Sequence, residues 1–184
     1  WDVLMNTVLE FAYLSAVIVL LIGCSANARY ENKHFENLFS LDVEETMVDI
    51  GNHDPYALTE YGNTLKEFYF KVIHETVDHY QERNNLQKFT EKAVFDHYVN
   101  TTKSRYAANM ASLDWISNVD TVVHKMPCTI HELKTDESGY PIRYKIAYYM
   151  SKNELYQLHV WVIEKRINRF NEGMNQMIYS FKEI

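Results

Sequence analysis

Apolar side chains between residues 56 and 83 recur at spacings of three and four, which is the period of one face of a helix. The residues that carry this pattern are Leu58, Tyr61, Leu65, Phe68, Val72, Ile73, Val77 and Tyr80. We therefore predict a long helix over residues 56–83, ended by the pair Asn84 and Asn85. A second helix is expected over residues 86–98, and a short third helix over residues 104–111.

The apolar period changes to two after Trp115, and a period of two is typical of β-strands. A strand broken by Pro127 is predicted over residues 121–133. Residues 140–150 alternate clearly, with Ile146 and its even-numbered neighbours on the inner face. This part of the chain is therefore expected to form a sheet.

The segments that follow complete a predicted antiparallel meander. Residues 151–154 have the composition of a hairpin loop. Apolar residues fall on both faces of the next segment, so the strand around Leu158 and Val160 is expected to be buried on both sides. Met177 and Phe181 alternate along a predicted last strand.

Helices followed by strands predict an α+β fold, in which the helices pack on one face of a curved antiparallel meander sheet. We expect three parts in the chain. A transmembrane helix occupies residues 1–26, a connector with one short helix at most occupies residues 27–55, and a cone-like α+β domain occupies residues 56–184.

The transmembrane prediction rests on an uncharged run from Phe11 to Cys24. Extended back to Val3, a helix of this length spans about 33 Å at 1.5 Å per residue. A bilayer core is about 30 Å thick, so the segment is long enough to cross it. Glu10 is expected at the headgroup boundary, and the alternative is a contact with a partner inside the bilayer. A buried core helix is the other interpretation of this run.

Residues 21–24, Leu-Ile-Gly-Cys, followed by Ser25, also resemble a bacterial lipobox. In that family a signal peptidase cuts before the cysteine, here Cys24, and a lipid is attached to its sulfur. Against this interpretation, Asp2 and Glu10 precede the apolar run where a signal peptide usually carries basic residues. The sequence leaves the lipoprotein as an alternative to the transmembrane anchor.

Four segments carry a family resemblance over residues 56–184. They read KFTEKAVFDHYVN, SLDWISNVDTVVHKMPCTIHEL, YPIRYKIAYYM and LYQLHVWVIEKRI. Helices before a Trp-containing link, a Val-Val strand and a meander resemble the cone fold of the nuclear transport factor two family. The pattern is most similar to the C-terminal domain of the mitochondrial import-motor membrane anchor. The resemblance implies a scaffold at a membrane and not an enzyme.

The charge balance disfavours nucleic acid as a partner. The chain has 25 acidic and 18 basic residues and a formal net charge of −7, whereas nucleic acid binding needs a basic surface. Fourteen tyrosines suit protein interfaces instead. The two cysteines, Cys24 and Cys128, are too few to organise a disulfide framework.

The histidines and Cys128 offer no convincing catalytic or metal site. His74 and His79 are five residues apart, which places them about 140° apart on a helix, whereas a zincin motif needs a spacing of four. Cys128 and His131 are three apart in a strand, so they point to opposite faces.

His124 and His159 could meet across the sheet, but two histidines without a third ligand make an incomplete metal site. We therefore expect no catalytic residue, no metal ligand and no cofactor. A glycine-rich phosphate loop is also absent from the sequence.

These observations predict a non-catalytic accessory or assembly subunit of a membrane protein complex. Its partners would be other protein subunits and the lipid bilayer, and not nucleic acid. A start at Trp1 rather than Met fits removal of a presequence, which favours the mitochondrial inner membrane. One alternative is a bacterial lipoprotein or type IV secretion component of the cell envelope. Another is a cone-fold domain that binds or converts a small molecule.

Overall fold

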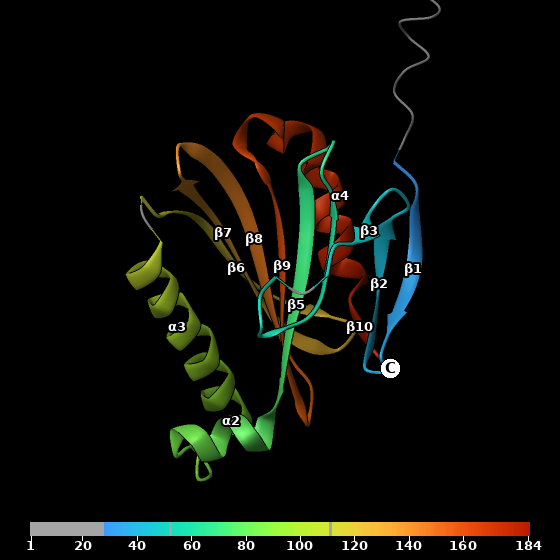
Figure 1. Cartoon of the computed structure of the whole chain (residues 1–184). Helices are drawn as coiled ribbons and strands as arrows, with labels where there is room; N and C mark the ends of the chain where they lie inside the picture. The colour runs from blue at the N-terminus through green and yellow to red at the C-terminus, as the bar shows by residue number, and fades with distance from the viewer. Residues whose placement is uncertain (1–27, 52, 111) are drawn as a thin grey trace, which may run out of the picture.

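The computed structural model describes residues 28–51, 53–110 and 112–184. Its strands form two antiparallel sheets (Figure 1). The large sheet has the order β3 (Val48–Asp49), β4 (Ala57–Asn63), β5 (Phe68–Thr76), β9 (Glu154–Ile163), β8 (Tyr140–Met150), β7 (Met126–Glu137) and β6 (Asp114–Val123). The small sheet contains β1 (Tyr30–Phe35), β2 (Phe39–Glu44) and β10 (Lys182–Glu183).

Helices lie on both faces of the large sheet (Figure 1). α2 (Val77–Asn84) and α3 (Glu91–Asn109) cover one face. A short 3₁₀ turn, η1 (Glu164–Arg166), leads into α4 (Ile167–Ser180), which packs on the other face together with the small sheet. The molecule is therefore a three-layer arrangement built around the large sheet.

Strand β9 separates two hydrophobic cores, because its successive side chains point to opposite faces. Leu158, Val160 and Val162 belong to the core on the α4 side. Leu155 belongs to the core beneath α2 and α3, and Trp161 packs against that core. All five positions follow one alternating pattern, so the register of β9 determines which of its side chains enter each core.

Close approaches of aromatic side chains fix α4 and the small sheet against the large one. The Phe181 ring stacks on Tyr149 with centroids 4.3 Å apart and on Phe39 at 4.9 Å. The Tyr30 hydroxyl lies against Gly173 of α4, at a point that a Cβ atom would occupy. Glycine at position 173 therefore lets α4 and β1 approach each other.

The predicted helix over residues 56–83 is wrong. The structure has the hairpin β4–β5 there, followed by the short helix α2. Phe68, Phe70 and Val72 are fully buried on one face of β5, so they follow a strand period of two. The turn between β4 and β5 shifts the alternation of apolar residues. Across the two strands together, the apolar residues therefore recur at spacings of three and four, as they would in a helix. Asn85 does end α2, in the left-handed conformation with φ of 57°.

Two further helix predictions need correction. Residues 91–109 form one continuous helix rather than two separate pieces. Thr102 is accommodated in it because its hydroxyl donates to the carbonyl of Tyr98 at 2.9 Å. The predicted last strand with Met177 and Phe181 is the end of α4, where Met174, Met177 and Ile178 form a buried helical face.

The meander prediction is confirmed in its centre. β8 alternates as expected, residues 151–153 link it to β9, and β9 is buried on both faces. The strand expected over residues 121–133 is the β6–β7 hairpin instead. Its turn is at His124 and Lys125, both with positive φ.

The expected fold class is also corrected. Residues 27–55 contain β1, β2 and β3 where a connector was predicted, and helices cover both faces of a sheet-dominated domain. The predicted anchor over residues 1–26, including Glu10 and Cys24, lies outside the described residues. Within residues 28–51, 53–110 and 112–184, no helix has the length and apolar composition needed to cross a membrane.

Candidate functional site

A hollow of about 710 Å³ lies over the part of the large sheet formed by β4, β5 and the end of β9. The core beneath α2 and α3 is built mainly on β7, β8 and β9, so these helices leave this part of the same face open. We call the hollow the Lys71 cleft. Its lining consists of Ile50, His53, Asp54, Pro55, Glu60, Thr64, Tyr69, Lys71 and Trp161.

Strand register brings the polar residues of the cleft together. Glu60 of β4 is opposite Lys71 of β5, and Lys71 is opposite His159 of β9. Residues paired in this way point to the same face of the sheet. Glu60, Lys71 and His159 therefore lie next to one another on one face of the sheet, each on a different strand.

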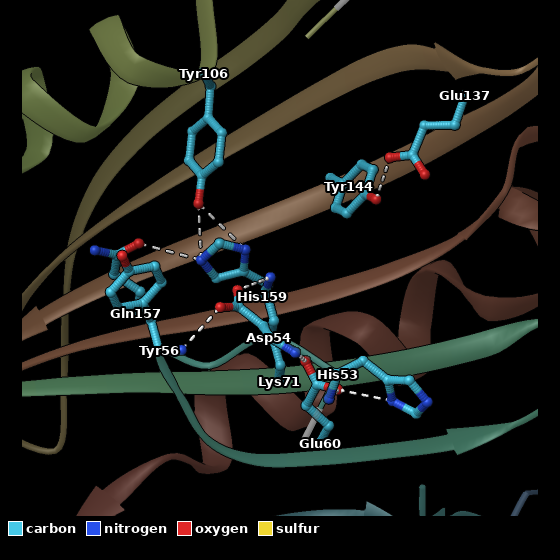
Figure 2. A network of polar contacts seen from close by, with 10 residues as sticks. All are labelled: His53, Asp54, Tyr56, Glu60, Lys71, Tyr106, Glu137, Tyr144, Gln157 and His159. Atoms are coloured by element: carbon cyan, nitrogen blue, oxygen red, sulfur yellow. Dashed lines mark hydrogen bonds and ion pairs between the residues drawn. The ribbon is translucent and has the colours of Figure 1, made fainter. Parts of the chain in front are cut away.

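A row of aromatic rings crosses the sheet beside these residues. Tyr69 stacks on Trp161 with centroids 5.5 Å apart, and Trp161 stacks on Tyr144 at 5.7 Å. The Tyr69 ring also lies against Gly62 of β4, where a Cβ atom would collide with it. The faces of these rings are thus largely occupied by one another, and the Tyr144 hydroxyl donates to Glu137 at 2.7 Å (Figure 2).

Lys71 and Asp54 form the ion pair at the centre of the cleft (Figure 2). The distance between Lys71 Nζ and Asp54 Oδ2 is 2.6 Å, and the backbone N–H of Tyr56 donates to Asp54 Oδ1 at 2.9 Å. Burial alone would raise the pKa of Asp54, but these two hydrogen bonds and the positive charge of Lys71 lower it below the usual value. Asp54 is therefore ionised at neutral pH.

Glu60 holds the chain that borders the cleft. Its side chain is almost fully buried. Oε2 accepts from the backbone N–H of His53 at 2.8 Å and lies 3.3 Å from the His53 ring, while Oε1 accepts from the N–H of Asp54 at 3.2 Å. This carboxylate therefore positions Asp54 in front of Lys71.

His159 lies on the inner side of the Lys71–Asp54 pair, between β9 and α3 (Figure 2). Its Nε2 is 3.1 Å from the amide oxygen of Gln157 and 3.1 Å from the hydroxyl of Tyr106. Gln157 in turn donates to the Tyr98 hydroxyl at 2.9 Å. The amide oxygen only accepts, so its contact with His159 is a hydrogen bond in the tautomer that carries the ring proton on Nε2.

Burial determines the charge state of His159. Loss of solvation lowers its pKa to about 3, with a further contribution from the positive charge of Lys71. The imidazole is neutral at physiological pH, and burial also raises the pKa of Tyr106. This network therefore suits the fixing of side chains and the binding of a ligand better than proton transfer.

The residues considered in the sequence analysis are not brought together into a site. His74 bonds to Glu154 at 2.7 Å, whereas His79 is exposed on α2. His124 occupies the exposed β6–β7 turn, two strands away from the buried His159. Among the residues that the structure describes, no group of three or more His, Cys, Asp and Glu side chains could hold a metal ion.

Cys128 and His131 occupy opposite faces of β7. Cys128 lies in the core on the α4 side, and burial raises the pKa of its thiol to about 12. His131 packs against Trp115 on the other side, with ring centroids 5.3 Å apart, and burial lowers its pKa to about 4. A thiol that burial keeps protonated behaves as a packing residue and not as a nucleophile.

The sequence analysis missed Lys71, Asp54, Glu60 and Tyr106. The signal for Lys71 was a cation between apolar residues in a segment rich in Phe and Val, which fits a strand with one polar face. The helical interpretation of residues 56–83 hid this signal. Tyr106 could not be placed before α3 was known to be a single helix.

Comparison with known proteins identifies the fold. No protein-family model and no curated protein sequence matches the chain. Among solved structures, the cyanobacterial PsbP (CyanoP) of Synechocystis sp. PCC 6803 is similar with a TM-score of 0.60 and 10% identity, over 88% of this chain and 96% of that one. LpqN of Mycobacterium tuberculosis, described as involved in cell envelope biogenesis, has a TM-score of 0.52 and 7% identity, over 86% and 92%.

The chain shares its fold with these two proteins. Their bacterial and cyanobacterial origin overturns the prediction of a mitochondrial inner-membrane location, which rested on the expected span and on a mitochondrial resemblance. The resemblance to the nuclear transport factor two family stays a prediction, because neither structure tests it.

We expect a pH dependence of stability that originates in His159. The unfolded chain takes up a proton near the ordinary pKa of 6.5, and the folded chain only near about 3. The stabilising contribution is therefore complete above pH 6.5 and is lost as the pH falls toward 3. Between pH 7 and pH 4 the wild type should lose about 3 kcal/mol more free energy of unfolding than His159→Gln.

Urea denaturation of the full chain at a series of pH values measures this difference. Tyr106→Phe is the matched control, because it removes a neighbouring hydroxyl and leaves the imidazole in place. Its free energy of unfolding should therefore change with pH in parallel with that of the wild type. Parallel curves for the wild type and His159→Gln would show that His159 is not held neutral by burial.

Proposed function

We propose that this protein is a non-catalytic accessory protein of a bacterial cell envelope that acts by contact with other proteins. The observation that carries the proposal is the pairing inside the Lys71 cleft: Asp54 neutralises Lys71, Glu60 is bound by backbone N–H groups, and His159 is neutral. These groups stabilise the fold and are not poised as a nucleophile or a general base. LpqN, which has the same fold, is described as involved in cell envelope biogenesis.

Strand β6 offers the contact surface. It is the last strand of the large sheet in the described part of the chain, and its ten residues leave one backbone edge without a partner strand. Ile116, Val119 and Val122 on it are 42%, 46% and 65% exposed. Long exposed edge strands pair readily with another chain, and proteins usually block them with lysine, proline or a very short strand.

The charge of β6 favours a basic partner. The strand contains Asp114 and Asp120 and has neither lysine nor arginine. The opposite edge of the sheet ends in the two-residue strand β3, so it offers little backbone for pairing. An extended, basic segment of a partner protein could add to β6 by main-chain hydrogen bonds, with apolar side chains over Val119 and Val122.

A photoreactive amino acid at position 122 of the full chain tests this surface in the cell that encodes it. The matched control is position 48 on β3, where Val48 is 62% exposed. We expect covalent adducts to one partner protein from position 122 and not from position 48. Val119→Lys should reduce the yield, because it places a positive charge opposite a basic segment.

Equal adducts at both positions, no adduct at position 122, or adducts only between two copies of this chain would contradict the β6 interface. Peptide mapping of the adduct also tests the chemistry, because the crosslinked partner segment should be rich in lysine or arginine.

The attachment that we propose for this accessory protein is a lipid on Cys24. Support comes from the lipobox-like residues 21–24 at the end of the uncharged run. Five residues, 25–29, separate Cys24 from the first strand, which begins at Tyr30. A chain of this length reaches at most about 20 Å. A lipid on Cys24 would therefore hold the domain close to the surface of the envelope membrane.

Metabolic labelling with an alkyne-modified palmitate tests the attachment. The wild type and Cys128→Ala should be labelled, and Cys24→Ala should not. The mass of the mature chain should correspond to a start at Cys24. Label that persists in Cys24→Ala, or a mature chain that keeps residues before position 24, would rule out the lipoprotein.

A further inference from the structure

The acceptor groups of the Lys71 cleft are already used. Both oxygens of Asp54 accept a hydrogen bond, one from Lys71 and one from the N–H of Tyr56. Both oxygens of Glu60 accept from the backbone of His53 or Asp54. A ligand that enters the cleft therefore finds its carboxylates occupied by donors of the protein itself.

The donor groups of the cleft are not used to the same extent. The ammonium of Lys71 has three N–H groups, and among the described residues only Asp54 accepts from it. The indole N–H of Trp161 and the hydroxyl of Tyr69 have no hydrogen-bond partner among the residues that the structure describes. All three of these groups can donate a hydrogen bond, and of the three only the Tyr69 hydroxyl can also accept one.

The charge of the cleft limits what kind of acceptor can enter. Asp54 neutralises Lys71, and the nearby Glu60 adds a negative charge that is almost fully shielded from water. An anion placed at Lys71 would meet this charge at short range in a partly buried setting, where repulsion is weakly screened. A neutral oxygen, such as a ketone or amide carbonyl, accepts the same hydrogen bonds without this penalty.

Most of the remaining surface of the cleft is apolar. Ile50, Pro55, Tyr69 and Trp161 contribute aliphatic surface and ring edges around Lys71. A volume of about 710 Å³ falls in the usual range for small-molecule sites, which are mostly apolar with a few well-placed polar groups. We propose that the Lys71 cleft binds a neutral, largely apolar molecule whose carbonyl oxygen accepts hydrogen bonds from Lys71.

Three probes that share one ring system test this proposal on the full chain. Fluorenone has the neutral carbonyl, fluorene lacks it, and fluorene-2-carboxylate carries an anionic acceptor. Binding is followed by titration with detection of backbone amide chemical shifts by NMR, which gives the affinity and the location together. We expect fluorenone to bind about tenfold more tightly than fluorene, the effect of about one hydrogen bond to a charged donor.

The shifts should cluster on β4, β5 and the end of β9, around Lys71 and Trp161. The double variant Asp54→Ala/Lys71→Met removes the donor together with the carboxylate that would otherwise be left unpaired. It should bind fluorenone and fluorene equally. Lys152→Met, which removes an exposed lysine on the turn between β8 and β9, is the control and should keep the tenfold preference.

Several results would overturn the proposal. One is equal affinity for fluorenone and fluorene in the wild type. Others are strongest binding of the carboxylate, or no binding of fluorenone up to its solubility limit. Shifts centred on a different hollow, which is lined by Glu91, Asp96 and Cys128, would also overturn it. A urea titration confirms that each variant is folded, so that loss of binding reports on the cleft. None of these results depends on the lipid at Cys24 or on the β6 interface.

Discussion

The placement of β9 in the middle of the large sheet is the constraint on which the rest of the structure depends. Its backbone pairs along nearly its whole length with β5 on one side and β8 on the other. Its side chains supply both cores, with Leu158 and Val160 toward α4 and Leu155 toward α2 and α3. A shift of one residue in its register would exchange the two faces and place His159 in the α4-side core.

The Lys71 cleft follows from the same constraint. The pairing of β5 with β9 sets Lys71 beside His159 and Tyr69 beside Trp161. Burial of Val72 on the opposite face of β5 fixes which way Lys71 points. The segment before β4 then closes over this polar group, because Glu60 and Lys71 bind the chain at Asp54. Among the described residues, charge pairing and backbone hydrogen bonds organise the site.

Strands in which apolar and polar residues alternate without a break could be predicted from the sequence. The prediction was wrong where the apolar pattern of one element continues into that of the next. β8 and β9 were recognised because Ile146 and Val160 lie in long regular runs. The β4–β5 hairpin was mistaken for a helix, because its turn shifts the alternation. The end of α4 was mistaken for a strand, since Met177 and Phe181 fit both periods. The cleft could not be predicted, because Asp54 and Lys71 meet only through the pairing of β4 with β5 and the hydrogen bond from the Asp54 N–H to Glu60.

Native-state hydrogen exchange of the backbone amides tests the central position of β9 most directly. If β9 is the shared wall of both cores, the amides of Leu158, His159 and Val160 should exchange only by global unfolding. Their exchange free energy should then equal the free energy of unfolding measured with urea, while amides of the edge strand β6 exchange through smaller openings. Exchange at Leu158 to Val160 that is as fast as exchange in β6 would contradict the account.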